Sequence, residues 1–446
     1  MPLLFSDLPP DVVLEVVQYL TLPEPIHLFL TCSSLYSLST HRSFWISILE
    51  TTRATSTIAC PRHDDLSEHT LESLKHLVFS WLRLQDNWSR PEPRIAQPVT
   101  SAALSEPAQI VFTVQGTDIL VLYMRESGTL LCWDVEANAP FPLPRIHSSG
   151  RITGVSEPCE SYGVCSNALL TMSFPFSIAH RHIYPPGAYF ESCFVTEDLT
   201  GSVVVTDQED YCTITARSIA DDRPSEDHVS SMKMPCEVSG DGHQTFCFTH
   251  ADHLYIVLED GASAHIQRIP CGALLSGPPS HAPAHHAVAP LPTLAGTGPH
   301  SPFCFILPST PACGVAAVFV HVLAAPAPPT TCFTFLLADA HPAAPLAFRA
   351  GVTALVPGHV FREDMALLWM DHGGAHVVVV MDSRGDGVPA LVLVRLDRAK
   401  GMAAVHRLMV PEDVDLRGLD GVSVNETAGA VHLIHRNNVL STLWYV

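Results

Sequence analysis

The chain has 446 residues, with 24 basic and 45 acidic side chains that give a formal net charge of −21 at pH 7. Only 15% of its residues are charged and its mean hydropathy is +0.22, which excludes a largely disordered chain. The excess of acid repels phosphate groups, so the sequence argues against nucleic-acid binding and against an anionic membrane surface. The length corresponds to two or three domains of about 150 residues each. We therefore expect a folded protein whose partner is another protein.

No targeting or membrane-spanning segment is expected from the sequence. The N-terminal residues lack a basic region and carry Asp7 and Asp11. The longest apolar run, residues 313–325, contains His321 and is shorter than the roughly 20 residues that a membrane helix needs. The 13 cysteines include no Cys-x-x-Cys pair. Reduced, mostly buried thiols in a cytoplasmic or nuclear protein are the expectation.

The apolar residues of segment 3–49 have the spacing of helices. The Leu-Pro-Pro-Asp sequence at residues 8–11 is a typical helix start, because a first-turn proline loses no hydrogen bond and an acid suits the positive end of the helix dipole. Apolar residues follow at spacings of three and four, at Val12, Val13, Val16, Val17 and Leu20. A proline-rich break at residues 22–25 predicts the end of this helix, and two further short helices are expected after it. A segment this small cannot bury all of its apolar surface alone, so part of it should face a partner.

This segment resembles an F-box. The match runs without a gap from the Leu8-Pro9 opening to the closing Trp45 and covers about a tenth of the chain. Two positions depart from the family pattern: Pro25 stands where an apolar helix former is usual, and Thr31 where valine is common. A small three-helix domain is the fold that the resemblance implies.

The resemblance also implies docking onto the Skp-type adaptor of a cullin-RING ubiquitin ligase, and through the adaptor onto a cullin. The positions that match the family's adaptor contacts are Leu8, Pro9, Val12, Val16, Leu20, Leu28 and Leu30. In physical terms this is the binding of apolar helix faces in a partner's groove. The alternative is that these residues form only the internal core of the three-helix domain.

A second helical segment follows the F-box-like residues. After a polar stretch at residues 51–65, apolar residues again repeat at helical spacing, at Leu71, Leu74, Leu77, Val78, Trp81 and Leu82. The pattern predicts an amphipathic helix that Ser67 or Thr70 caps and that ends near Trp88. Prolines then mark a linker, and we expect the helix to pack the head onto the body.

Beyond residue 99 the pattern changes to short runs of Val, Ile, Leu, Phe and Thr between turn residues. Strand–turn–strand units are recognisable at residues 119–135, 190–207, 254–269, 377–397 and 431–445. Hairpins repeated at intervals of roughly 50–70 residues predict a β-propeller of six or seven blades, with a pair of β-sandwiches as the alternative. The expected boundaries are residues 1–50 for the F-box, 51–98 for the helical linker and 99–446 for the all-β domain.

Three details of the β domain follow from the same pattern. A propeller has no exposed sheet edge if its first and last strands share a blade, and residues 109–114 and 439–445 are the expected pair. Trp133-Asp134 is similar to the WD-repeat signature, although the matching Gly-His dipeptide is absent. The tryptophans at 133, 369 and 444 are expected to pack in sheet cores.

The proline-rich segments and the histidine clusters have simpler interpretations than binding sites. Segments 277–302 and 324–329 are rich in proline and are expected to be loops, the first of them flexible or a surface excursion. Histidines at 180 and 182 and at 281, 285 and 286 lack the supporting residues of a metal site, and residues 382–387 have the composition of a hairpin turn. No nucleophile elbow, phosphate-binding glycine loop or zinc-protease motif is present. We expect no metal, no cofactor and no catalytic residue.

The sequence thus predicts a non-catalytic substrate receptor of an SCF-type ubiquitin ligase, whose β domain binds the protein to be ubiquitylated. Two alternatives are an F-box scaffold without substrate turnover and a propeller enzyme with a helical head. Acidic residues in the turns predict that the loops prefer basic protein segments. Lysine occurs only at Lys75, Lys233 and Lys400, which would limit self-modification.

Overall fold

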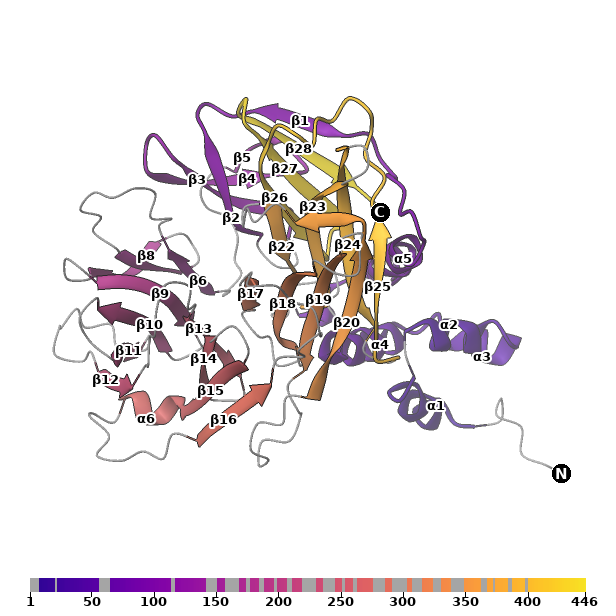
Figure 1. Ribbon diagram of the computed structural model, residues 1–446. Coiled ribbons are helices and arrows are strands. Elements are labelled where there is room, and N and C mark those ends of the chain that lie inside the picture. The colour runs from indigo at the N-terminus through magenta and orange to yellow at the C-terminus, as the bar shows by residue number, and fades with distance from the viewer. Residues whose placement is uncertain are drawn as a thin grey trace.

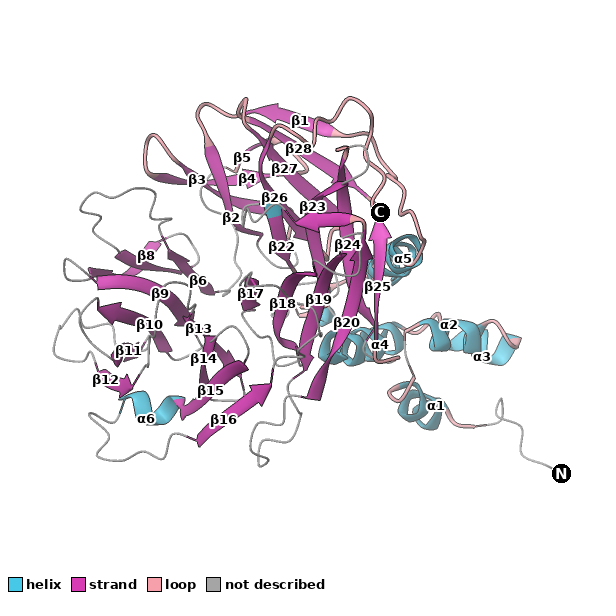
Figure 2. Ribbon diagram, viewed as in Figure 1, coloured by secondary structure: helices cyan, strands magenta, loops and turns pink. Residues whose placement is uncertain are grey.

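The computed structural model has an N-terminal helical head, a linker helix and a body made of β-sheets (Figures 1 and 2). It describes residues 8–20, 22–55, 65–113, 117–141, 151–156, 168–173, 177–183, 188–195, 199–206, 211–218, 230–235, 245–250, 253–259, 263–275, 285–290, 303–306, 315–323, 330–337, 349–361, 367–371, 374–383, 387–397 and 400–446. The sequence predicted this order, in which a few N-terminal helices precede a mostly β region.

The head consists of α1 (Pro10–Val17), α2 (Pro23–Phe29), α3 (Ser33–Leu38) and α4 (Arg42–Thr55). Residues 23–55 thus form three helices rather than the two expected, and α4 continues past the expected boundary at residue 50. Cys32, with φ −156°, is extended and separates α2 from α3. The hydroxyl groups of Ser39 and Thr40 donate to backbone carbonyls of the preceding turn, which favours the end of α3. Apolar spacing alone does not reveal such polar breaks.

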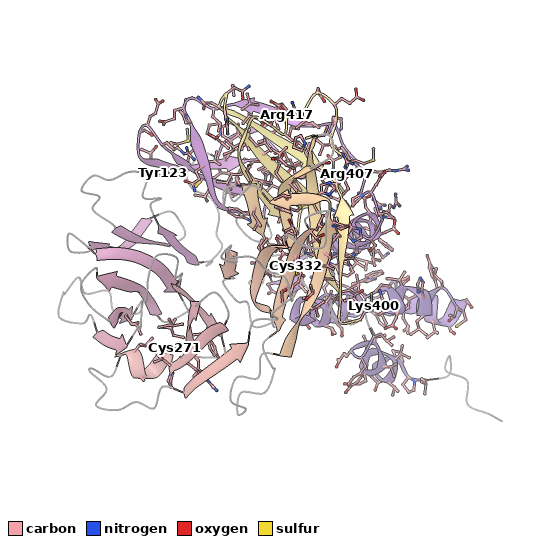
Figure 3. The ribbon with its side chains drawn as sticks, viewed as in Figure 1. Tyr123, Cys271, Cys332, Lys400, Arg407 and Arg417 are labelled. Atoms are coloured by element: carbon pink, nitrogen blue, oxygen red, sulfur yellow. The ribbon has the colours of Figure 1, made fainter. Side chains whose placement is uncertain are left out.

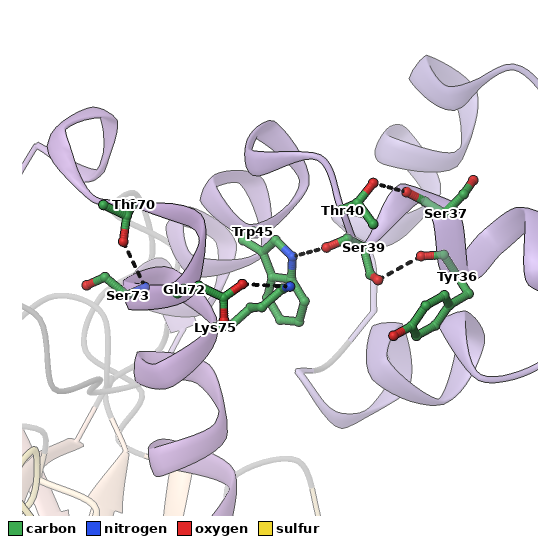
Figure 4. A network of polar contacts seen from close by, with 9 residues as sticks. All are labelled: Tyr36, Ser37, Ser39, Thr40, Trp45, Thr70, Glu72, Ser73 and Lys75. Atoms are coloured by element: carbon green, nitrogen blue, oxygen red, sulfur yellow. Dashed lines mark hydrogen bonds and ion pairs between the residues drawn. The ribbon is translucent and has the colours of Figure 1, made fainter.

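The linker contains a short 3₁₀ turn, η2 (Leu66–Glu68), and the helix α5 (Leu71–Trp88). Thr70 is the N-cap of α5, and its Oγ1 accepts a hydrogen bond from the Ser73 backbone N–H at 3.2 Å (Figure 4). The predicted cap and the predicted end of this helix at Trp88 are confirmed.

The described strands form seven antiparallel sheets, each built mainly from consecutive strands. The first three sheets are β2 (Ala108–Thr113), β3 (Ile119–Met124), β4 (Thr129–Asp134) and β5 (Ala139–Pro140); β6 (Arg151–Ser156), β7 (Ala168–Ser173) and β8 (Ser177–Ile183); and β9 (Ala188–Val195), β10 (Leu199–Thr206), β11 (Tyr211–Ser218) and β12 (Ser230–Pro235). The next two are β13 (Thr245–His250), β14 (His253–Glu259), β15 (Ser263–Pro270) and β16 (His285–Pro290), with α6 (Cys271–Leu275) after β15; and β17 (Phe303–Ile306), β18 (Val315–Leu323), β19 (Thr330–Leu337) and β20 (Arg349–Pro357). The last two are β21 (His359–Phe361), β22 (Leu368–Met370), β23 (His376–Ser383), β24 (Pro389–Asp397) and β25 (Met402–Arg407); and β26 (Leu419–Asn425), β27 (Ala430–His435), β28 (Val439–Trp444) and β1 (Thr100–Ala103).

The sheets are arranged as in a β-propeller. Strands of successive sheets contact one another, β6 with β9, β9 with β13, β13 with β17, and β22 with β26, and β26 in turn contacts β2. These five contacts join successive sheets through the first or second strand of each sheet, which is the arrangement of strands around a central axis. The fold class predicted from the repeated hairpins is confirmed.

The ring is closed by β1, which pairs with β28 from Thr100↔Thr442 to Ala103↔Val439. The predicted closing strand, residues 109–114, was wrong, because β2 begins the next sheet instead. Strand β1 has only four residues, Thr-Ser-Ala-Ala, and no strongly apolar side chain. A short polar strand whose partner lies far along the chain gives no periodic signal.

Local turn chemistry predicted the hairpins well. Strands β3 and β4 pair across a turn in which Gly128 has φ +64°, a conformation that glycine adopts without strain. One loop prediction was wrong: residues 285–290 form β16, which pairs with β15. The remainder of segment 277–302, segment 324–329 and residues 384–386 lie outside the described residues.

The tryptophans predicted to pack in sheet cores do so. Trp133 is 6% exposed and belongs to the core between the β2–β5 and closing sheets, and Trp369 and Trp444 pack against the same cluster.

Candidate functional site

The helices of the head divide their apolar residues between an internal core and an outer face. In α1, Val13 and Val17 are 1% and 2% exposed, whereas Val12, which directly precedes Val13, is 40% exposed. In α2, Phe29 is 3% exposed and the following Leu30 is 70% exposed. The core residues pack against α4 and α5, so the opposite faces of α1 and α2 are directed away from the rest of the head.

None of the seven positions that match F-box adaptor contacts is among the buried residues. Pro9, Val12 and Leu30 are exposed, and four others are half-buried, namely Leu8, Val16, Leu20 and Leu28. The half-buried leucines also pack partly against the core of the head, so they serve the fold as well.

Sequence reasoning missed two exposed aromatic residues of the head. Tyr19 is 85% exposed and Tyr36 is 57% exposed. Tyr19 lies in the turn that follows α1, and its backbone N–H donates to the Val16 carbonyl at 3.1 Å. It therefore lies beyond the end of α1, and the family pattern does not mark this position.

The core of the head is fixed by aromatic contacts and by one buried hydrogen bond. The ring centroids of Phe29 and Phe44 are 4.4 Å apart in an edge-to-face arrangement. Trp45 donates its Nε1–H to the Ser39 carbonyl at 2.7 Å (Figure 4). The same indole packs against Phe79 of α5, which joins the head to the linker helix.

The C-terminal end of α5 is inserted into the core of the body. Leu84 and Trp88 are each 1% exposed and belong to one cluster with side chains of β23, β24, β26, β27 and β28. Gly429, in the β26–β27 turn, permits the close approach of α5: a Cβ atom there would lie 2.6 Å from Cδ1 of Leu84. The position also has φ +65°, which favours glycine.

Asn87 of α5 connects the linker with the last strand of the body. Its Nδ2 group donates to the carbonyls of Arg94 and Tyr445, both at 2.7 Å, and its Oδ1 accepts from the Arg94 backbone N–H at 2.9 Å. Arg395 of β24 adds hydrogen bonds to Ser89 Oγ, at 2.6 Å, and to Gln85 Oε1.

The residues after α5 continue along the edge of the body. The backbone N–H groups of Arg407 and Met409 donate to the carbonyls of Pro91, at 3.3 Å, and Pro93, at 3.0 Å. Ala96 donates its backbone N–H to the Trp444 carbonyl at 2.8 Å. We call α5 together with residues 89–97 and their contacts on the body the junction.

Two histidines lie in the junction. The His406 Nδ1–H donates to the Arg90 carbonyl at 2.6 Å, and burial, with Arg395 and His376 nearby, lowers the pKa of His406 below its usual value. His376 is 4% exposed, and its Nδ1 contacts the buried carboxylate of Asp371. Its ring packs against the indole of Trp88, with 4.9 Å between the ring centroids.

Burial explains the strongly shifted pKa values of groups elsewhere in the body. Burial lowers the pKa of His432 to about 3 and raises the pKa of the Cys132 thiol to about 11. Among the described residues, no group of three or more His, Cys, Asp or Glu side chains is placed to hold a metal ion. Within the same residues, no helix is long and apolar enough to cross a membrane.

No protein-family model and no curated protein matches the sequence. Solved structures with a similar fold include an oligogalacturonate lyase in complex with manganese (12% identity, TM-score 0.43, 78% of this chain and 92% of that chain) and Kluyveromyces lactis Hsv2 (12%, 0.38, 74% and 91%). The β-propeller domain of Vanderwaltozyma polyspora Nup133 is another (10%, 0.36, 78% and 99%). Because these similarities are low, the assignment of a propeller fold depends on the strand order of this chain and not on the comparisons.

Proposed function

We propose that the chain is a substrate receptor of an SCF-type ubiquitin ligase. Helices α1–α4 bind a Skp-type adaptor, the adaptor binds a cullin, and the propeller binds the protein to be ubiquitylated. The observation that carries the proposal is the division of α1 and α2 into two faces, because the positions that match F-box adaptor contacts stay accessible while Val13, Val17 and Phe29 form the core.

The outer face has the chemistry of a helix-in-groove contact. Burying one exposed leucine or valine stabilises a complex by about 1.5–3 kcal/mol. A few such anchors at the centre of an interface provide most of its binding free energy. Leu30 and Val12 are 70% and 40% exposed, so both can serve as such anchors.

The chain itself performs no chemistry in this proposal. A receptor accelerates ubiquitin transfer by holding a substrate lysine near an activated thioester, and this effect depends on position. The junction supports such a role, since Leu84, Trp88 and Asn87 fix α5 to the body.

The test is retention of a tagged Skp-type adaptor by the full chain. We expect Leu30→Glu to abolish retention, because it places a charge in an apolar contact without disturbing the core. Met402→Glu is the matched control: Met402 is 63% exposed, in β25 of the body, and its substitution should leave binding unchanged. Failure of the wild-type chain to retain the adaptor refutes the proposal.

Adaptor binding alone does not separate a receptor from a scaffold. Inhibition of the cullin should raise the cellular level of proteins that bind the propeller. If the adaptor binds but no bound protein becomes more stable, the chain acts as an F-box scaffold.

A further inference from the structure

Three basic side chains of the body lie against the end of α5 and the residues that follow it: His376 of β23, Arg395 of β24 and His406 of β25. His376 and Arg395 are directly opposite each other in the sheet. His406 is opposite Leu393, and side chains two residues apart in a strand share a face, so His406 lies on the face of Arg395. We call these three side chains the basic patch.

The basic patch binds neutral oxygen atoms of the linker. Arg395 donates to Ser89 Oγ at 2.6 Å and to Gln85 Oε1. His406 donates its Nδ1–H to the Arg90 carbonyl at 2.6 Å. These hydrogen bonds hold the end of α5 on the body, and none of their acceptors is a carboxylate.

The surroundings of His406 oppose a positive charge on its ring. Burial is the main cause that lowers the pKa of His406, and Arg395 and His376 lower it further, whereas the hydrogen bond to Arg90 acts against them. The carboxylates around the patch are already engaged in three pairs: Asp371 with His376, Asp397 with Lys400, and Asp86 with Arg90. The closed junction therefore favours a neutral His406.

Two buried polar atoms of the junction have no hydrogen-bond partner among the described residues. They are Trp88 Nε1 and His376 Nε2, in side chains that are 1% and 4% exposed and whose ring centroids are 4.9 Å apart. A buried polar atom without a partner has lost its hydrogen bonds with water, so each of these atoms favours a state in which α5 separates from the body and water enters. The closed state is thus less strongly preferred than its apolar packing suggests.

We propose that the junction is an acid-sensitive latch, which fixes α5 on the body at neutral pH and releases it when His406 takes up a proton. In the released state water surrounds the imidazole, and its pKa returns to about 6.5. Release therefore includes the uptake of a proton, so it becomes more favourable as the pH falls below about 6.5. The latch holds whether or not the head binds an adaptor. In a ligase it would determine whether the substrate is held at a fixed distance from the transferring enzyme, and only this consequence rests on the proposed function.

Hydrogen exchange of the full chain between about pH 7.5 and 5.5 tests the latch. The reporters are three backbone N–H groups that bond across the junction, those of Ala96, Met409 and Arg407, the last of which is labelled in Figure 3. After correction for the intrinsic exchange rate, the equilibrium constant for opening at these amides should rise by up to about tenfold per pH unit, the limit for uptake of one proton. The hairpin of β3 and β4, where Figure 3 labels Tyr123 on the other side of the body, should stay protected.

His406→Gln is the critical variant, because glutamine can still donate to the Arg90 carbonyl but does not titrate. It should remove the pH dependence of opening at the three reporter amides. The matched control is His359→Gln, which changes a histidine that contacts the Pro357 carbonyl outside the junction and should leave the pH dependence as in wild type. Equal protection of the wild-type reporters at both pH values, an equal loss of protection in the β3–β4 hairpin, or an unchanged pH dependence in His406→Gln overturns the inference.

Discussion

Gly429 offers the sharpest test of how α5 is held on the body. In Gly429→Ala the new Cβ would lie 2.6 Å from Cδ1 of Leu84, and the backbone would keep φ +65°. The left-handed conformation costs a non-glycine residue roughly 1–2 kcal/mol. Overpacking of a filled site costs roughly a further 1–3 kcal/mol. We therefore expect the substitution to lower the free energy of unfolding by about 2–5 kcal/mol.

The two contributions can be separated by matched variants. Gly358 has φ +73° with no atom within 4 Å of its Cβ position, so Gly358→Ala reports the backbone contribution alone. Leu84→Ala removes the clashing methyl groups, so the double variant should be more stable than the sum of the single effects predicts, by about 1–3 kcal/mol. Urea unfolding of the full chain, followed by circular dichroism, measures the wild type and the four variants. Equal destabilisation by Gly429→Ala and Gly358→Ala, or strict additivity with Leu84→Ala, would refute the close approach of α5.

Other predictions concern the polar contacts of the linker. His406 has a lowered pKa in the folded chain, so the folded state binds fewer protons than the unfolded state; its contribution to stability is present above about pH 6.5 and is lost as the pH falls below it. His406→Gln should flatten the fall in unfolding midpoint between pH 7 and 5, and an unchanged slope would contradict this. Asn87→Ala should cost about 1–3 kcal/mol and accelerate proteolysis within residues 89–97, because the buried carbonyl of Tyr445 and the part-buried carbonyl of Arg94 lose their donor; protection equal to wild type contradicts it. Thr70→Ala should cost about 0.5–2 kcal/mol, and Thr70→Ser should restore most of that stability if the cap is responsible.

The features that could be predicted from the sequence are those with local causes. The hairpin of β3 and β4 follows from two apolar runs, one on each side of a turn that ends in Gly128. The start of α5 follows from the Thr70 cap, and the two faces of α1 follow from helical spacing. Each of these requires only residues that are close together in the chain.

The features that were missed depend on distant partners. Asn87 and Tyr445 are 358 positions apart, and neither lies in a motif that marks the contact. Strand β1 is recognisable only beside β28, because its four residues have no apolar run. Tyr19 lies in the turn after α1, and the adaptor positions were taken from the family pattern, which does not include it.

The junction also couples the head to the closure of the ring. Residues 89–97 follow α5 directly and lead into β1, the strand that completes the sheet of β26, β27 and β28. Separating α5 from the body would therefore strain the pairing of β1 with β28 through residues 89–99, which join the two elements. Stability of the propeller and placement of the head then change together, so Gly429→Ala should weaken both, whereas a head substitution such as Leu30→Glu should weaken only adaptor binding.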